Sequence, residues 1–121
     1  MAAADLKHIS IKDTNGIAVV DFVNSQLMFA TDVVEEIGAE LNSLISDHRY
    51  SKIILDFRNV QYVSSMMLAK LASLERHVET AKGKLKFCGL GPVLRDTFRI
   101  GHFERVFDIY DNTDKALQSP W

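Results

Sequence analysis

The sequence lacks the residues that usually cross-link small secreted or metal-dependent domains. Cys88 is the only cysteine, so no disulfide can form within the chain, as is typical of proteins in a reducing cytoplasm. The four histidines show no zinc-type spacing with one another or with this cysteine; they are His8, His48, His77 and His102. We therefore expect no metal ion and no cofactor, and we expect Cys88 to be a small buried residue of an apolar strand.

Long apolar runs and an excess of charge of one sign are also missing. The longest apolar stretches, such as Ile53–Leu55, fall far short of the roughly 20 residues of a membrane-spanning helix, and Met1–Lys7 lacks the pattern of a secretory signal. With 14 Lys and Arg against 16 Asp and Glu, the formal net charge of -2 provides no field that would attract nucleic acid. We expect a cytoplasmic protein with no direct nucleic-acid binding and no direct membrane insertion, although it could dock on a membrane partner.

The common catalytic motifs are absent as well. There is no Gly-x-Ser-x-Gly, and neither Ser64 nor Ser65 comes with a histidine and an acid in a recognisable arrangement for nucleophilic catalysis. Gly89-Leu90-Gly91 resembles a fragment of a phosphate-binding loop, but it lacks the third glycine and the P-loop lysine, and a tight turn into a helix at Pro92 explains it more simply. We expect a protein that is not an enzyme. The alternative of a nucleotide-binding protein rests on this one segment, Gly89 to Pro92.

What is present is the patterning of one folded domain. The 121 residues are 47% hydrophobic and 25% charged, which suits a single globular domain over residues 1–121. Alternating or continuous apolar residues predict strands, and apolar residues at helical spacing predict helices. The predicted strands are His8–Lys12, Ile17–Val23, Lys52–Phe57, Lys84–Cys88 and a short strand within Phe103–Tyr110; the predicted helices are Ala30–Asp47, Ser64 to about Ala81, Pro92 to about Arg99, and Asn112 to about Leu117.

The order of these elements, β-β-α-β-α-β-α-β-α, predicts the topology. Turn residues at Asp13–Gly16 join the first two strands as an antiparallel hairpin. Each later strand follows a helix, so it should lie parallel to its neighbours in one sheet. The sequence therefore predicts an α/β fold with a mixed sheet of four or five strands and helices mostly on one face.

The middle of the chain resembles a known family. Leu55-Asp56-Phe57 ends an apolar strand, and Ser64-Ser65 opens the following helix. This is similar to the core of the STAS family of anti-sigma factor antagonists, in which a strand ending in Leu-Asp-Leu is followed by Asp-Ser-Ser-Gly at a helix start. The resemblance continues through Gly101–Tyr110 and into the terminal helix, so it covers nearly the whole chain and implies a STAS-like single domain.

The resemblance also implies a function and a site. In the family, the second serine of the pair is phosphorylated by a partner anti-sigma factor that is an ATP-dependent serine kinase, and phosphorylation ends binding. By position the phosphorylated residue is Ser65, with Ser64 as the second choice. The residues that would contact the partner are Asp56, Ser64, Ser65, Met66 and Met67.

Two departures from the family pattern leave alternatives open. Val63 stands where the family has an acidic residue, and Met66 stands where it has glycine. One alternative is that Ser64 only caps the helix and no kinase acts on Ser65. Another is a constitutive STAS-type subunit of a transporter or a larger signalling assembly. The oligomeric state, including a homodimer, also stays open.

Overall fold

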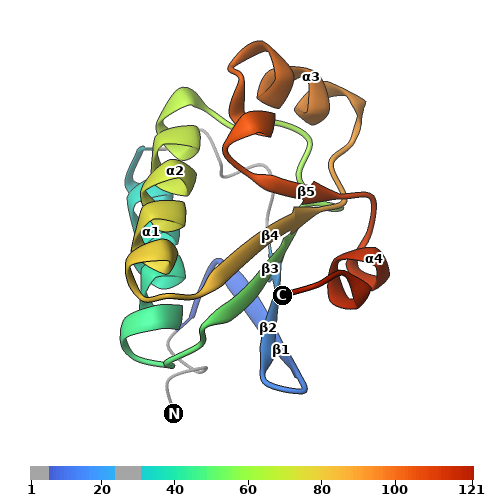
Figure 1. Cartoon of the computed structure of the whole chain (residues 1–121). Helices are drawn as coiled ribbons and strands as arrows, with labels where there is room; N and C mark the ends of the chain where they lie inside the picture. Colours follow the sequence, from blue (N-terminus) through green and yellow to red (C-terminus); the bar gives the residue numbers. More distant parts are fainter. Residues whose placement is uncertain (1–5, 24–30) are drawn as a thin grey trace.

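The computed structural model describes residues 6–23 and 31–121, which form a five-stranded mixed sheet with helices on both of its faces (Figure 1). The predicted order of elements is confirmed. Its elements are β1 Ile9–Thr14, β2 Ile17–Phe22, α1 Thr31–Ser46, β3 Lys52–Asp56, α2 Ser65–Thr80, β4 Lys84–Cys88, α3 Pro92–Ile100, the short 3₁₀ helix η3 Phe103–Arg105, β5 Asp108–Tyr110 and α4 Thr113–Gln118. Ala30, the predicted start of the first helix, lies outside the described residues, as does the stretch 1–5.

The strands lie in the sheet in the same order as in the chain. β1 and β2 pair antiparallel, and β2, β3, β4 and β5 pair parallel in succession. The hairpin turns at Asn15 and Gly16, both with positive φ, as a tight β-turn requires. The predicted hairpin and the predicted parallel strands are both confirmed.

The main core lies under α1, α2 and α3. Figure 1 shows α1 and α2 side by side over one face of the sheet, with α3 above them beyond the ends of the strands. Six phenylalanine rings form one continuous set of contacts from β2 to η3, with neighbouring centroids 4.3–6.2 Å apart; they are Phe22, Phe57, Phe87, Phe98, Phe103 and Phe107. Aromatic pairs at these distances attract each other beyond their burial. The rings therefore fix α3 and η3 against the sheet.

The other face of the sheet is covered by α4. Here a smaller core forms from Val19, Ile54, Cys88 and Ala116. Cys88 is fully buried, as expected, and burial raises the pKa of its thiol to about 11. Among the described helices, α1 and α2 cover one face, α3 packs on the same core, and α4 covers the other face, which confirms the predicted arrangement with helices mostly on one side.

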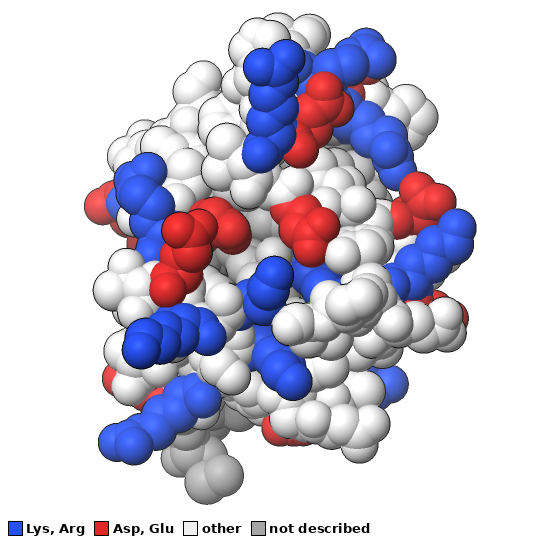
Figure 2. All heavy atoms as spheres, viewed as in Figure 1, with Lys and Arg blue, Asp and Glu red and all other residues white. Residues whose placement is uncertain are grey.

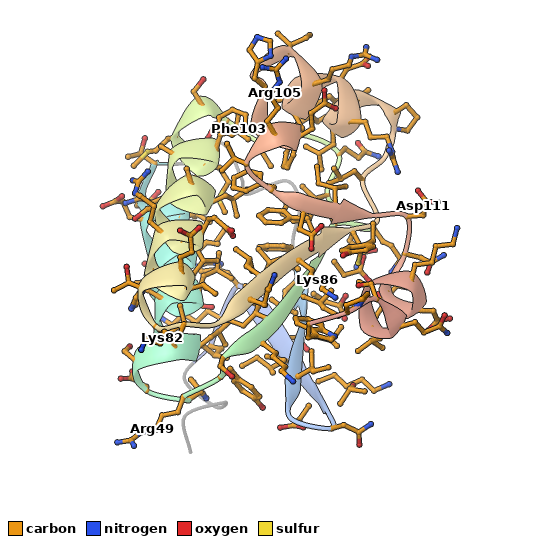
Figure 3. All side chains as sticks on the ribbon, viewed as in Figure 1. Arg49, Lys82, Lys86, Phe103, Arg105 and Asp111 are labelled. Atoms are coloured by element: carbon orange, nitrogen blue, oxygen red, sulfur yellow. The ribbon has the colours of Figure 1, made fainter. Side chains whose placement is uncertain are left out.

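A fully buried lysine fastens α4 and the residues that follow it. The Lys86 ammonium donates to the carbonyl oxygens of Ala116 at 2.9 Å, Pro120 at 3.1 Å and Ser119 at 3.2 Å, and also to the Ser119 hydroxyl (Figure 3). It lies 3.8 Å from the centroid of the Trp121 ring. Carbonyls at a helix C-terminus carry partial negative charge and attract a cation, and an aromatic face does the same. Lys86 therefore acts as an internal cap for α4.

The end of α2 shows why a glycine follows it. α2 ends at Thr80, and Lys82 and Gly83 then lead the chain into β4. The left-handed residue, however, is Lys82 with φ 61°. A Cβ on Gly83 would lie 2.3 Å from the Ser51 carbonyl oxygen. Gly83 is therefore required by the close approach of the chain before β3, while the turn itself is made by a lysine.

The surface carries charges of both signs, and Figure 2 shows acidic and basic side chains interspersed over the face in view. Within residues 6–23 and 31–121, no helix combines the length and the apolar character needed to cross a membrane.

One carboxylate is poorly solvated. Glu75 on α2 is half-buried, and its Oε2 is a buried oxygen with no hydrogen-bond partner among the described residues. Desolvation raises the pKa of Glu75 above its usual value, the negative charges of Glu79 and Asp108 raise it further, and Lys84 opposes them. Folding therefore favours the protonated form of Glu75 over its ionised form.

Core truncation should destabilise the domain strongly. Leu55→Ala in β3 and Leu71→Ala in α2 each remove a side chain with no exposed area, so each should lower the free energy of unfolding by about 2 to 5 kcal/mol. Ile100→Ala is the control, because Ile100 is 76% exposed, and it should change stability by no more than about 0.5 kcal/mol. Urea denaturation measures all three. Equal midpoints for the core variants and the wild type would show that the assigned core is wrong.

Replacing Glu75 by Gln should change how stability depends on pH. The folded pKa of Glu75 lies above its unfolded value of about 4.3, so its contribution is present below that value and is lost as the pH rises through the folded pKa. At a pH of about 4, near the unfolded pKa, Glu75→Gln and the wild type should have the same thermal midpoint. At neutral pH the thermal midpoint of Glu75→Gln should be higher than that of the wild type. Glu104→Gln, an exposed change on η3, is the control and should follow the wild-type curve. A Glu75→Gln curve parallel to the wild type at every pH would contradict the assignment.

Candidate functional site

The start of α2 presents two serines in different settings. Ser64 is the N-cap, and its Oγ accepts a hydrogen bond from the Met67 amide at 3.1 Å. Ser65 is the first helical residue and is exposed, and its hydroxyl has no hydrogen bond to any other described residue. The two positions therefore divide the roles: Ser64 is engaged in holding the helix start, and Ser65 is accessible from solvent.

The two methionines that follow also differ. Met66 is partly buried against the core, with part of its side chain on the surface. Met67 has no exposed area, because it lies one helical turn before Leu71 on the face that packs against the sheet. The expectation that Met67 contacts a partner directly therefore needs correction, since its side chain belongs to the core.

Asp56, predicted as a contact residue, is also inside the protein at only 3% exposure. Its Oδ1 accepts a hydrogen bond from the Arg58 amide at 3.0 Å. Its Oδ2 lies 2.9 Å from Arg58 Nε and accepts from the Thr113 hydroxyl at 3.3 Å. A buried carboxylate needs such partners. Its side chain is therefore occupied in joining the loop after β3 to the first residue of α4.

A third loop reaches the same carboxylate at Gly89, directly after β4. Gly89 has φ +75°, and a Cβ there would lie 2.6 Å from Asp56 Oδ1 and 3.1 Å from the Arg58 amide nitrogen. Its amide donates to the Asp111 carbonyl, which precedes α4. Glycine is therefore needed at this position both for its backbone conformation and for space. The segment Gly89–Gly91 leads from β4 directly into α3, with Gly91 as the N-cap and Pro92 as the first helical residue.

A second carboxylate stands beside Asp56. Asp21 on β2 is its cross-strand neighbour and lies 3.7 Å from Arg58 Nη2. Desolvation raises the pKa of Asp21, and the negative charge of Asp56 adds to this, while Arg58 opposes it. Among the described residues, no group of three or more His, Cys, Asp or Glu side chains could hold a metal ion.

An open hollow of about 350 Å³ lies next to the loop that leads into α2. Sequence reasoning missed it, because its two walls are far apart in the chain. The loop after β3 supplies Arg58, Val60, Gln61 and Tyr62, and the segment after β4, together with the first turn of α3, supplies Gly89, Gly91, Pro92, Val93 and Leu94. The carboxyl ends of adjacent parallel strands bring the two loops together. The signal in the sequence was the presence of apolar residues, such as Val60 and Val93, in segments between elements where polar residues are common.

Three features together define a STAS-like domain. They are a mixed sheet that begins with a hairpin, two helices packed side by side on one face, and a second helix with Ser64 as its N-cap and Ser65 as its first residue. The chain belongs to the STAS domain family, which matches residues 5–116.

Related proteins share this fold. BtrV of Bordetella bronchiseptica, which carries the name of an anti-sigma factor antagonist, is 27% identical over 82 residues, covering 68% of this chain and 70% of that protein. A Thermotoga maritima protein of the same description has a TM-score of 0.78 at 13% identity, over 91% of this chain and 92% of that chain. The phosphorylated form of the Bacillus cell fate determinant SpoIIAA has a TM-score of 0.64 at 18% identity, over 88% and 93% of the two chains.

The fold also occurs as part of a larger protein. The murine anion transporter Slc26a9 has a TM-score of 0.70 at 17% identity, over 89% of this chain but only 18% of the transporter.

Adding a methyl group at Gly89 should be more damaging than adding one at Gly16. Both glycines have positive φ, so each alanine carries about 1 to 2 kcal/mol of backbone strain. Nothing lies within 4 Å of a Cβ at Gly16, whereas a Cβ at Gly89 meets the Asp56 carboxylate. Gly89→Ala should therefore destabilise the fold more than Gly16→Ala in chemical denaturation.

A double-mutant cycle isolates the contact. Asp56→Ala removes the carboxylate, so Gly89→Ala should do less additional damage in that background than in the wild type. Strictly additive changes in unfolding free energy would mean that Asp56 and Gly89 do not touch.

Proposed function

We propose that this chain is an anti-sigma factor antagonist: in its unphosphorylated form it binds an anti-sigma factor and frees the sigma factor, and phosphorylation of Ser65 by that partner, a serine kinase, reverses binding. The observation that carries the proposal is the position of Ser65, exposed as the first residue of α2 beside an occupied N-cap. The protein would act in the cytoplasm by binding alone, without catalysis or a cofactor of its own.

The helix start suits a switch by charge. A phosphate adds about -1.5 to -2 charges, and a helix N-terminus tolerates negative charge, so the fold would accept it. A partner packed over the same surface would have to bury that charge against its own side chains. Phosphorylation would therefore act on the interface and leave the domain intact.

The related proteins support both the antagonist function and its control by phosphorylation. BtrV carries the name of an anti-sigma factor antagonist, and SpoIIAA, of the same fold, has been seen in a phosphorylated form. Contact with the partner would come from Ser64, Ser65 and Met66, which reach the surface, while Asp56 would support the loop from below.

A second candidate is a constitutive interaction module within a transporter or a signalling assembly. Val63 and Met66 replace the acid and the glycine of the family pattern, and the same fold occurs within Slc26a9. Val63 is partly buried against the core, so it cannot replace an exposed acidic contact. Only the switch requires a kinase and a phosphorylated Ser65.

Ser65→Asp should separate binding from folding. The substitution lies on the surface, so it should change stability by about 0.5 kcal/mol or less. If the partner packs over Ser65, an unpaired buried carboxylate should weaken the complex by at least about 2 kcal/mol, or roughly thirtyfold in affinity. Calorimetry with the purified anti-sigma factor that copurifies with the chain measures this.

Ser64→Asp is the matched control. Aspartate is a good N-cap, and its charge would point toward the amides of the helix start, so the loss of affinity should be smaller. Wild-type protein incubated with the partner and ATP should gain phosphate on Ser65. Equal affinity of wild type and Ser65→Asp, with no phosphate on Ser65, would leave the constitutive module as the better account. Sedimentation of the same samples would give the oligomeric state, including any homodimer.

A further inference from the structure

The face of the sheet that α4 covers has a small core of its own. Among the described helices, α4 alone lies on this side, and the C-terminal residues return from it toward the strands (Figure 1). The buried residues of this core form a cluster separate from the main one, with two more side chains partly buried against it; they are Val19, Ile54, Cys88 and Ala116, joined by Leu117 and Trp121. A helix of six residues is marginally stable by itself. The position of α4 therefore depends on this small cluster and on polar contacts.

The polar contacts come from Lys86. All of its hydrogen-bond acceptors among the described residues lie in the segment 116–120, and the Trp121 ring covers the ammonium. The buried charge is satisfied only when this whole segment is in place, because each missing acceptor leaves part of it unpaired. When the segment moves away, water reaches the ammonium and replaces the lost hydrogen bonds. Lys86 therefore favours two arrangements, one closed with every acceptor in place and one open in water.

The connection between β5 and α4 lies on the surface. Asp111 and Asn112 form this connection and are both exposed, and Figure 3 shows Asp111 where the chain leaves the sheet. Asp111 pairs with Arg95 at 3.0 Å and with Lys115 at 3.1 Å, and exposed ion pairs of this kind contribute little to stability. The Gly89 amide donates to the Asp111 carbonyl at 3.3 Å. Movement of α4 about this connection therefore costs little and leaves the main core in place.

The first residue of α4 connects this cover to the loop before α2. The Thr113 hydroxyl donates to Asp56 Oδ2 at 3.3 Å and lies 3.5 Å from Cys88 Sγ. Asp56 also accepts from the Arg58 amide, at the start of the loop that leads to Ser65. Movement of α4 away from the sheet therefore removes one partner of a buried carboxylate, and it admits water beside that carboxylate and beside the Cys88 thiol.

We propose that α4 and residues 119–121 form a latch, held by Lys86, that opens while the main core stays folded. Opening exposes Cys88 and withdraws Thr113 from Asp56, so the loop before α2 becomes more mobile. Units with few buried apolar contacts open in this way at a lower free energy than global unfolding. The latch gives the serine site an input from the opposite face of the sheet, separate from phosphorylation. This motion is a property of the chain alone, so it stands or falls independently of any partner.

The rate at which a thiol reagent labels Cys88 in the wild-type protein measures the opening. At low urea this rate should hardly change with urea, because opening of the latch exposes little surface. At higher urea the rate should rise steeply as global unfolding takes over. A rate with the full urea dependence of global unfolding at every concentration would show that Cys88 is reached only when the whole domain unfolds, and the proposal would be overturned.

Trp121→Ala tests what holds the latch closed, with Gln118→Ala as its control. Trp121 covers the Lys86 ammonium, whereas Gln118 is exposed on α4 itself. At low urea we expect Trp121→Ala to speed labelling of Cys88 about tenfold or more, and Gln118→Ala to change it by less than about twofold. Equal low-urea rates for Trp121→Ala and wild type would mean that Cys88 is reached without movement of α4, which contradicts the latch. The wild-type urea dependence decides the question even if Trp121→Ala does not fold.

Hydrogen exchange tests the link from the latch to the loop. The Arg58 amide is bonded to a buried carboxylate, and it should exchange faster in Trp121→Ala than in wild type, by about the same factor as the labelling of Cys88. The Gly16 amide, bonded to a carboxylate in the β1–β2 hairpin, is the control and should exchange at the wild-type rate. If labelling of Cys88 speeds up while exchange of the Arg58 amide does not, the latch opens without loosening the loop, and the proposed input to the serine site is wrong.

Discussion

The carboxylate of Asp56 is the interaction on which the working end of the domain depends. Asp56 is the last residue of β3. Its carboxylate accepts hydrogen bonds from the Arg58 amide and the Thr113 hydroxyl, and it lies where a Cβ on residue 89 would otherwise be. Three loops that leave parallel strands at one edge of the sheet are thereby held at fixed distances from each other. This buried carboxylate therefore contributes to the spacing of the loops around α2 and α3, together with the hydrogen bond from the Gly89 amide to the Asp111 carbonyl.

Periodicity predicted the order of the elements, the hairpin and the parallel strands, because these depend on residues close in sequence. It could not predict Lys86, whose position in an alternating strand looks exposed but whose partners lie about thirty residues later. It could have placed Met67 in the core, since Met67 is four residues before Leu71. Glycine is common just after a helix, but the contact that requires Gly83, with Ser51, exists only in the folded protein.

The site combines a rigid support with an exposed surface whose charge can change. Ser65 is exposed, whereas the loop that precedes it is held at its start by the hydrogen bond from the Arg58 amide to Asp56 and by the buried ring of Phe57. In the proposed switch this division means that the surface can gain charge while its shape is unchanged. The partner then senses chemistry alone, and no conformational change of the domain has to be transmitted.

The cap that Lys86 provides for α4 has a consequence for biosynthesis. The carbonyls that satisfy this ammonium belong to residues 116–120, so they leave the ribosome after every strand of the sheet. Until then β4 carries an unpaired cation on a face that has no cover, and burial of that face is unfavourable. The hairpin and the first helices can collapse during translation at about 5 to 20 residues per second, but the second face of the sheet closes only after α4 has emerged. A nascent chain stalled before residue 116 should therefore remain open on one side and be a substrate for chaperones.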